Sequence, residues 1–164
     1  MNINPITFKE KPNNYAVIDK TVSRSAQPKK SDFVWLKSQG ITDVINFRTM
    51  YFSDIDFNEQ EVVENLGMKY HNISSVTRHP KEENVKAFLN IVEDVEKSGG
   101  KVHIHCKAGS DRTGMYSYIY KALKGLGDNC GNHLEAINMG HNYKLYPDLI
   151  SWANRFVHNL KQGK

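Results

Sequence analysis

The chain is poor in cysteine and has no long apolar segment. Cys106 and Cys130 are its 2 cysteines among 164 residues, too few for the disulfide framework of a small secreted protein. No apolar run approaches the ~18 residues of a membrane-spanning helix. The first residues, MNINP, lack the basic stretch and apolar core of a secretory signal. We therefore expect a cytoplasmic protein without a transmembrane segment, while export by a route without a cleaved signal stays open.

The chain also lacks concentrated charge and metal-binding spacings. Its 22 basic and 18 acidic residues are scattered, giving a formal net charge of +4. This excess fits either a solvated lysine-rich surface or a basic rim that attracts an anionic substrate. The 7 histidines show no His-Glu-x-x-His spacing, and the cysteines no Cys-x-x-Cys spacing. We expect no nucleic-acid partner, no metal site and no cofactor; the oligomeric state stays open.

The rest of the composition, 39% hydrophobic and 24% charged, is that of an ordinary globular protein. No repeat, low-complexity tract or linker divides the chain, so we expect one domain over residues 1–164. The adjacent apolar pair Val44 and Ile45 is typical of a strand that is covered on both faces.

Strand-like and helix-like segments alternate along this domain. Strands are expected at residues 15–18, 22–25, 41–47, 68–73 and 101–105. A helix capped by Ser31 or Asp32 is expected to end at Gly40. Further helices are expected at 58–66, from 82 to a stop at Gly99-Gly100, at 112–124 and after Pro147. The alternation predicts an α/β fold, with a central, mostly parallel sheet flanked by helices.

The segment between the last predicted strand and the helix after it reads HCKAGSDRTG, residues 105–114. A phosphate dianion needs several hydrogen-bond donors, and the unpaired first-turn amides of a helix supply them. Ala108 and Gly109 are small enough for the loop to close on the anion, and Arg112 offers a planar fork to two phosphate oxygens. Helix amides and nearby cations favour the thiolate form of Cys106, which can attack phosphorus. The segment therefore predicts hydrolysis of phosphate monoesters through a phosphocysteine intermediate.

This segment resembles the Cys-x5-Arg loop of the protein tyrosine and dual-specificity phosphatase superfamily. Two further stretches, SRSAQP at 23–28 and DVINFR at 43–48, resemble the opening strands of its small bacterial, fungal and plant dual-specificity-like members. The resemblance therefore covers most of the domain, most strongly at 102–118. It implies the phosphatase fold, with the phosphate-binding loop between a strand and a helix.

The resemblance also implies roles for the loop residues. Cys106 would form the phosphocysteine, and Arg112 would clamp the phosphoryl group. Thr113 would hydrogen-bond the sulfur as it leaves, and His105 would hold the loop in shape. The other residues expected to bind substrate are Lys107, Ala108, Gly109, Ser110 and Gly114.

The general acid departs from the family pattern. These enzymes usually carry an acidic Asp some 30 residues before the cysteine, but HNISSVTRHP at 71–80 contains no carboxylate. Asp111 is the first candidate, because myotubularin-type lipid phosphatases also carry an acidic residue in the loop. Asp54 or Asp56 could reach in instead. His79 could serve, or a good leaving group could need no acid at all.

The substrate class rests on thinner observations. Lys107 follows the nucleophile in a chain of positive net charge, which favours multiply phosphorylated substrates such as inositol phosphates or phosphoinositides. The Cys106–Gly109 stretch also resembles phosphoinositide phosphatases, which carry a second lysine where this chain has Ser110. The main alternative is a protein tyrosine or dual-specificity phosphatase. A rhodanese-like sulfurtransferase and an inactive phosphate-binding module are remoter alternatives, since the loop keeps both Cys106 and Arg112.

Several other residues have two interpretations each. Arg24 and Arg48 could point at the pocket or form structural ion pairs. Arg78 lies where the acid loop would be and could contact substrate. Cys130 could resolve an oxidised Cys106, or be an incidental loop cysteine.

Overall fold

The computed structural model describes residues 11–49, 54–127, 131–132, 137, 139–142 and 144–163. Within this part of the chain, five strands form one sheet in the order β1-β2-β5-β3-β4. β1 pairs antiparallel with β2, and every other pairing is parallel. The strands are β1 (Ala16–Val17), β2 (Val22–Ser25), β3 (Asp43–Asn46), β4 (Lys69–Asn72) and β5 (Val102–His105).

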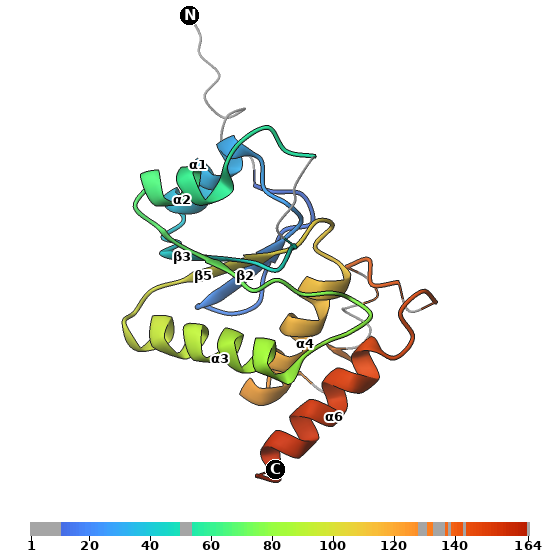
Figure 1. The fold of residues 1–164 in the computed structure, drawn as a ribbon. Coiled ribbons are helices and arrows are strands. Elements are labelled where there is room, and N and C mark those ends of the chain that lie inside the picture. The colour runs from blue at the N-terminus through green and yellow to red at the C-terminus, as the bar shows by residue number, and fades with distance from the viewer. Residues whose placement is uncertain are drawn as a thin grey trace, which may run out of the picture.

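Helices cover both faces of this sheet. Figure 1 shows α1 and α2 on one face, and α3, α4 and α6 on the other. The helices are α1 (Lys30–Ser38), α2 (Glu59–Asn65), α3 (Glu82–Lys97), α4 (Asp111–Lys124) and α6 (Leu149–Lys161). The predicted α/β class with a mostly parallel sheet is confirmed. No helix in the described ranges is long and apolar enough to cross a membrane.

The three central strands separate two hydrophobic cores. Val44 belongs to the smaller core beneath α1 and α2, whereas Ile45 belongs to the larger one beneath α3, α4 and α6. This confirms that the strand is covered on both faces. On β5, Val102 and Ile104 also face the larger core. Because side chains alternate along a strand, His103 and His105 point to the opposite face, toward α1 and α2.

The predicted boundaries shift by small amounts. The helix expected to be capped by Ser31 or Asp32 begins at Lys30, with Lys29 at the N-cap position. Asp32 instead lies in the first turn, where its carboxylate accepts a hydrogen bond from the Lys29 backbone N–H at 2.8 Å. The cap prediction is therefore wrong in position. The helix expected at residues 112–124 begins at Asp111, one residue earlier.

Candidate active site

The signature loop, residues 105–114, begins at the centre of the sheet, where β5 reaches the edge formed by the carboxyl ends of the parallel strands. β5 lies between the parallel strands β2 and β3, and it runs directly into the loop and then into α4. Ligands of open α/β sheets bind beyond the carboxyl ends of their strands. Cys106, the first residue after β5, is 2% exposed. The nucleophile predicted from the sequence is thus enclosed at the position where this fold type binds ligands.

The carbonyl groups of residues 106–109 are bound by His105 and by residues outside the loop. Each of four consecutive carbonyls accepts a hydrogen bond: Cys106 from His105 Nδ1 (3.1 Å), Lys107 from the Gln27 N–H (2.9 Å), Ala108 from Asn14 Nδ2 (3.2 Å) and Gly109 from Arg24 Nη2 (2.6 Å). Within the described part of the chain, the N–H groups of residues 107–112 donate to no protein acceptor. The loop therefore offers a set of amide donors to an anion.

Gly109 has a more specific role than small size. Its φ is 76°, in the left-handed region that favours glycine. A Cβ at this position would lie 2.6 Å from the Ala26 nitrogen and 2.7 Å from the Ser25 oxygen. The glycine is thus needed where the loop passes the end of β2, on the side where Arg24 and Asn14 hold its carbonyl.

The two side chains expected to bind the phosphoryl group and the leaving sulfur, Arg112 and Thr113, have different surroundings. Arg112 is partly buried, and its Nη1 donates to the Ser75 carbonyl at 3.4 Å, a long contact. The Thr113 hydroxyl is fully buried and has no hydrogen-bond partner among the described residues. A buried hydroxyl without a partner is costly, so a group within its reach would gain a hydrogen bond.

The other loop residues are also placed. Lys107 is exposed, and the Ser110 hydroxyl donates to the Met139 carbonyl at 3.2 Å. The Ser110 side chain thus contacts the segment before α6, which leaves its backbone N–H as the group available to a substrate. Gly114 is buried in the first turn of α4, where a Cβ would meet Arg24 Nη2 at an ordinary 3.9 Å.

The candidate acids differ in their contacts. Asp111 Oδ1 accepts hydrogen bonds from His141 Nδ1 at 2.7 Å and from the Asn142 N–H at 2.8 Å. Asp54 forms a two-point ion pair with Arg48, one contact of which is 3.2 Å long. The Arg48 hydrogen bond lowers the pKa of Asp54, which keeps this carboxyl ionised. Asp56 and His79 are exposed.

The arginines outside the loop contact other protein groups. Arg48 forms an ion pair with Asp54, as one of its two interpretations expected. Arg24 is 1% exposed and donates a hydrogen bond to the Gly109 carbonyl. The Arg78 guanidinium lies over the Tyr146 ring, 5.1 Å from its centroid. Cys130 lies outside the described residues.

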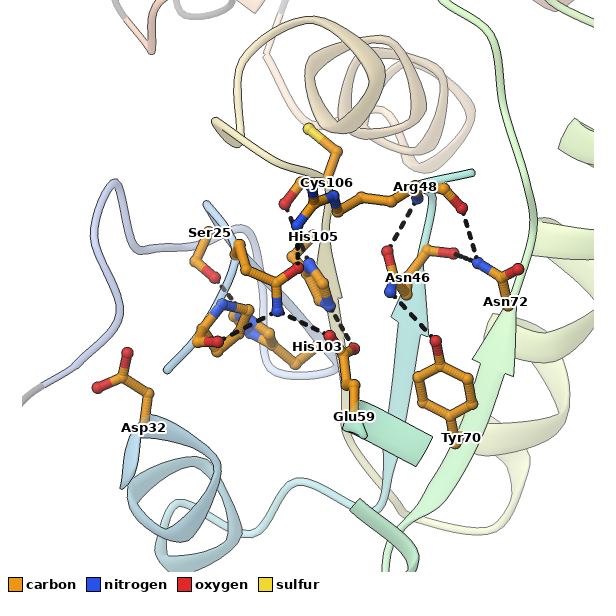
Figure 2. Close-up of polar contacts among 12 residues, drawn as sticks. Ser25, Asp32, Asn46, Arg48, Glu59, Tyr70, Asn72, His103, His105 and Cys106 are labelled. Atoms are coloured by element: carbon orange, nitrogen blue, oxygen red, sulfur yellow. Dashed lines mark hydrogen bonds and ion pairs between the residues drawn. The ribbon is translucent and has the colours of Figure 1, made fainter. Parts of the chain in front are cut away.

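A row of polar residues behind the loop was not anticipated from the sequence (Figure 2). His105 contacts Glu59, Glu59 accepts from Gln27, and Gln27 accepts from Arg48. Glu59 and His105 are 46 positions apart, so no local spacing could have linked them. The available signals were Gln27 and Arg48, which lie within the SRSAQP and DVINFR segments that resemble the family.

His103 fastens β5 to β2 on the same face. Burial, together with the charge of His105, holds the pKa of His103 well below its usual value. Ser25 already donates its hydroxyl hydrogen to the Ala26 carbonyl, so it accepts from His103 Nε2 at 2.7 Å. Ser23 then donates to Nδ1 at 2.8 Å. His103 is therefore a neutral, structural histidine with its proton on Nε2.

Comparison with known proteins agrees with this geometry. A family model described as "DSP-PTPase phosphatase fused to NAD+ Kinase" matches residues 2–136. No curated protein sequence matches the chain.

Solved structures share the fold at low identity. A DUF442 protein from Shewanella putrefaciens CN-32 is 24% identical with a TM-score of 0.76, covering 95% of this chain and 96% of its own. The core catalytic domain of the PP-IP phosphatase SIW14 from S. cerevisiae is 15% identical with a TM-score of 0.71, and the match covers 91% of this chain and 86% of that one. TpbA from P. aeruginosa is 18% identical with a TM-score of 0.68, and the match covers 97% of this chain and 88% of that one.

Proposed function

Since the chain belongs to this DSP-PTPase phosphatase family and is a cysteine-dependent phosphoric monoester hydrolase, we propose that Cys106 is its nucleophile. The observation that carries this proposal is the orientation of the loop around it. Four carbonyls are bound by His105 and by residues outside the loop, and the N–H groups of residues 107–112 donate to no other described residue. Such converging donors stabilise negative charge on the equatorial oxygens of a phosphoryl group. The catalytic domain would span residues 1–164.

The reaction has two steps. In the first, the Cys106 sulfur bonds to phosphorus while the bond from phosphorus to the ester oxygen breaks, and an acid protonates that oxygen. In the second, water attacks phosphorus and gives a proton to the acid that was deprotonated in the first step, the sulfur leaves, and inorganic phosphate is released. Arg112 binds two phosphate oxygens. The Thr113 hydroxyl, which has no partner in the part of the chain that the structure describes, donates to the sulfur as it leaves.

Asp111 is our proposed acid. Asp54 is less suited, because Arg48 lowers its pKa and holds it ionised at neutral pH. Asp111 lies in the first turn of α4, directly before Arg112, and has no bonded cation other than a protonated His141 among the described residues. A His141 Nδ1–H can donate to either protonation state of Asp111, since its other carboxyl oxygen can carry the proton.

The substrate class we favour is a multiply phosphorylated small molecule, an inositol phosphate or a phosphoinositide. Lys107 supports this, because it is exposed next to the nucleophile and could contact a second phosphate. One structural relative, SIW14, is a PP-IP phosphatase. The second candidate is a phosphotyrosine substrate, since TpbA has been solved in complex with pTyr.

Turnover of nitrophenyl phosphate tests the nucleophile. Cys106→Ser should abolish turnover, because a serine hydroxyl is not appreciably ionised at neutral pH. Cys130→Ser is the matched control and should retain the rate. Rapid acid quench followed by mass spectrometry should find one phosphoryl group on the peptide that contains Cys106. A Cys106→Ser rate close to that of the unmodified protein would refute the covalent mechanism, and chelators should leave the rate unchanged.

A further inference from the structure

A buried row of hydrogen bonds runs from the end of β3 to the nucleophile (Figure 2). Arg48 Nη1 donates to Gln27 Oε1 (2.8 Å), and Gln27 Nε2 donates to Glu59 Oε1 (2.7 Å). Glu59 Oε2 contacts His105 Nε2 (2.6 Å), and His105 Nδ1 donates to the Cys106 carbonyl (3.1 Å). Glu59 and His105 are 2% and 0% exposed, so water cannot replace the two contacts that His105 makes.

The bonding pattern fixes where protons are. A carbonyl oxygen can only accept, so the proton that His105 shares with Cys106 is on Nδ1. The contact between His105 Nε2 and Glu59 Oε2 contains a second proton, carried by one partner or the other. The pair thus consists either of an imidazolium and a carboxylate, or of a neutral imidazole and a carboxylic acid.

Three features favour the ionised pair. Glu59 is the first residue of α2, where helix amides favour a negative charge. Its other oxygen accepts a hydrogen bond from Gln27, which also favours the carboxylate. Gln27 is in turn bonded to the permanently charged Arg48 guanidinium, which orients the amide so that its N–H faces Glu59.

We propose that Glu59 is a positioning residue for the nucleophile. Its carboxylate keeps His105 protonated on both ring nitrogens, with Nδ1–H held on the Cys106 carbonyl. The positive charge then lies beside Cys106 and favours its thiolate. This inference rests on the proposed role of Cys106, but it concerns a residue that never touches substrate.

The other ionisable groups around the pair do not supply this effect. His103 is neutral, and burial, with the Glu59 charge second, raises the pKa of Tyr70 on β4 to about 12. Asp32 on α1 is bonded to the Lys29 backbone. The remaining charges that the structure describes near the loop stay in place when Glu59 alone is changed. They are Arg24, Arg48 with Asp54, Lys107, and Arg112 with Asp111.

Glu59→Gln removes the negative charge of the side chain but keeps its size. The carbonyl of the substituted side chain can still accept from Gln27, and its amide can donate to Nε2 of a neutral His105, whose Nδ1–H stays on Cys106. Every hydrogen bond survives and only the charge is lost. We expect the pH midpoint of iodoacetamide alkylation, measured in a Cys130→Ser background, to rise by about one unit. The pH midpoint of the acid limb of the kcat/KM profile should rise by a similar amount.

Asp43→Asn is the matched control. Asp43 is also a buried carboxylate bonded to a histidine, His71, at 2.8 Å, but it lies at the start of β3, away from the loop. This variant removes a comparable pair and should leave the alkylation midpoint unchanged. A Glu59→Gln midpoint equal to that of Asp43→Asn would overturn the inference, because a purely structural role predicts that outcome.

Nitrogen-15 NMR of the unmodified protein tests the same point without a variant that could fail to fold. Near neutral pH, both His105 ring nitrogens should show imidazolium shifts, and neutral His103 provides an internal reference. A neutral His105 overturns the inference. Absence of nitrophenyl phosphate turnover, with an imidazolium His105 and a shifted midpoint, would overturn the proposed function and leave the role of Glu59 standing.

Discussion

At the scale of single residues, Gly109 and Gly125 have nearly the same backbone conformation but very different surroundings. Their φ values are 76° and 71°, yet a Cβ on Gly125 would meet nothing within 4 Å. Gly125→Ala should therefore cost only the strain of a left-handed alanine, about 1–2 kcal/mol. Gly109→Ala should cost more and should also lower kcat/KM, because the loop must move away from β2. Chemical denaturation and turnover of both variants measure the contrast; equal losses would mean that the contact is relieved without disturbing the loop.

Asp111 is tested by comparing leaving groups. Asp111→Asn keeps an oxygen that can accept from His141 and Asn142, but it cannot release a proton. We expect it to slow alkyl phosphates by ~10²–10⁴-fold and nitrophenyl phosphate far less, since nitrophenolate barely needs a proton. Asp54→Asn should not show this contrast. Equal losses on both substrates would make Asp111 a structural residue.

At the scale of elements, the sequence predicts what is local and misses what crosses the sheet. Apolar spacing placed the five strands and the described helices, because that pattern repeats within one element. The loop motif also placed Cys106 between β5 and α4. By contrast, Arg24 binds a carbonyl 85 positions away, and Glu59 binds a histidine 46 positions away. These partners depend on strand order, which no local pattern encodes.

The pairing of β3 with β4 has a pH dependence that can be measured. Burial alone would raise the pKa of Asp43, but hydrogen bonds from His71 and Thr42 outweigh it, and the net pKa is lowered. The folded protein then binds this proton more weakly than the unfolded chain does. The carboxylate therefore stabilises the fold above the usual Asp pKa, and this contribution is lost as the pH falls through the folded value.

Asp43→Asn should consequently be less stable than the unmodified protein around neutral pH, and the difference should shrink as the pH falls below the usual Asp pKa. Urea unfolding at several pH values measures it. Glu93→Gln breaks an exposed pair with Lys97 on α3 and provides a control with little effect at any pH. A difference that stays constant with pH would show that Asp43 contributes through packing alone.

At the scale of the whole molecule, the net positive charge bears on substrate preference through the basic side chain beside the nucleophile, Lys107. Lys107→Ala should reduce the preference for inositol phosphates over phosphotyrosine peptides several-fold, because an exposed cation contributes ~1 kcal/mol to binding each added phosphate. Rising salt should reduce the preference in the same way. Lys97→Ala, an exposed lysine on α3, should leave it unchanged. The substrate proposal fails if a phosphotyrosine peptide outruns every inositol phosphate and Lys107→Ala leaves that ranking intact.

The Asn14 side chain contacts two segments that are synthesised at different times. Its amide donates to Ala108 and also to Met139 at 2.8 Å, a residue 125 positions later. A chain still emerging from the ribosome can form β5 and the loop well before it can form that second contact. The full set of contacts around the loop therefore forms only after Met139 has been synthesised.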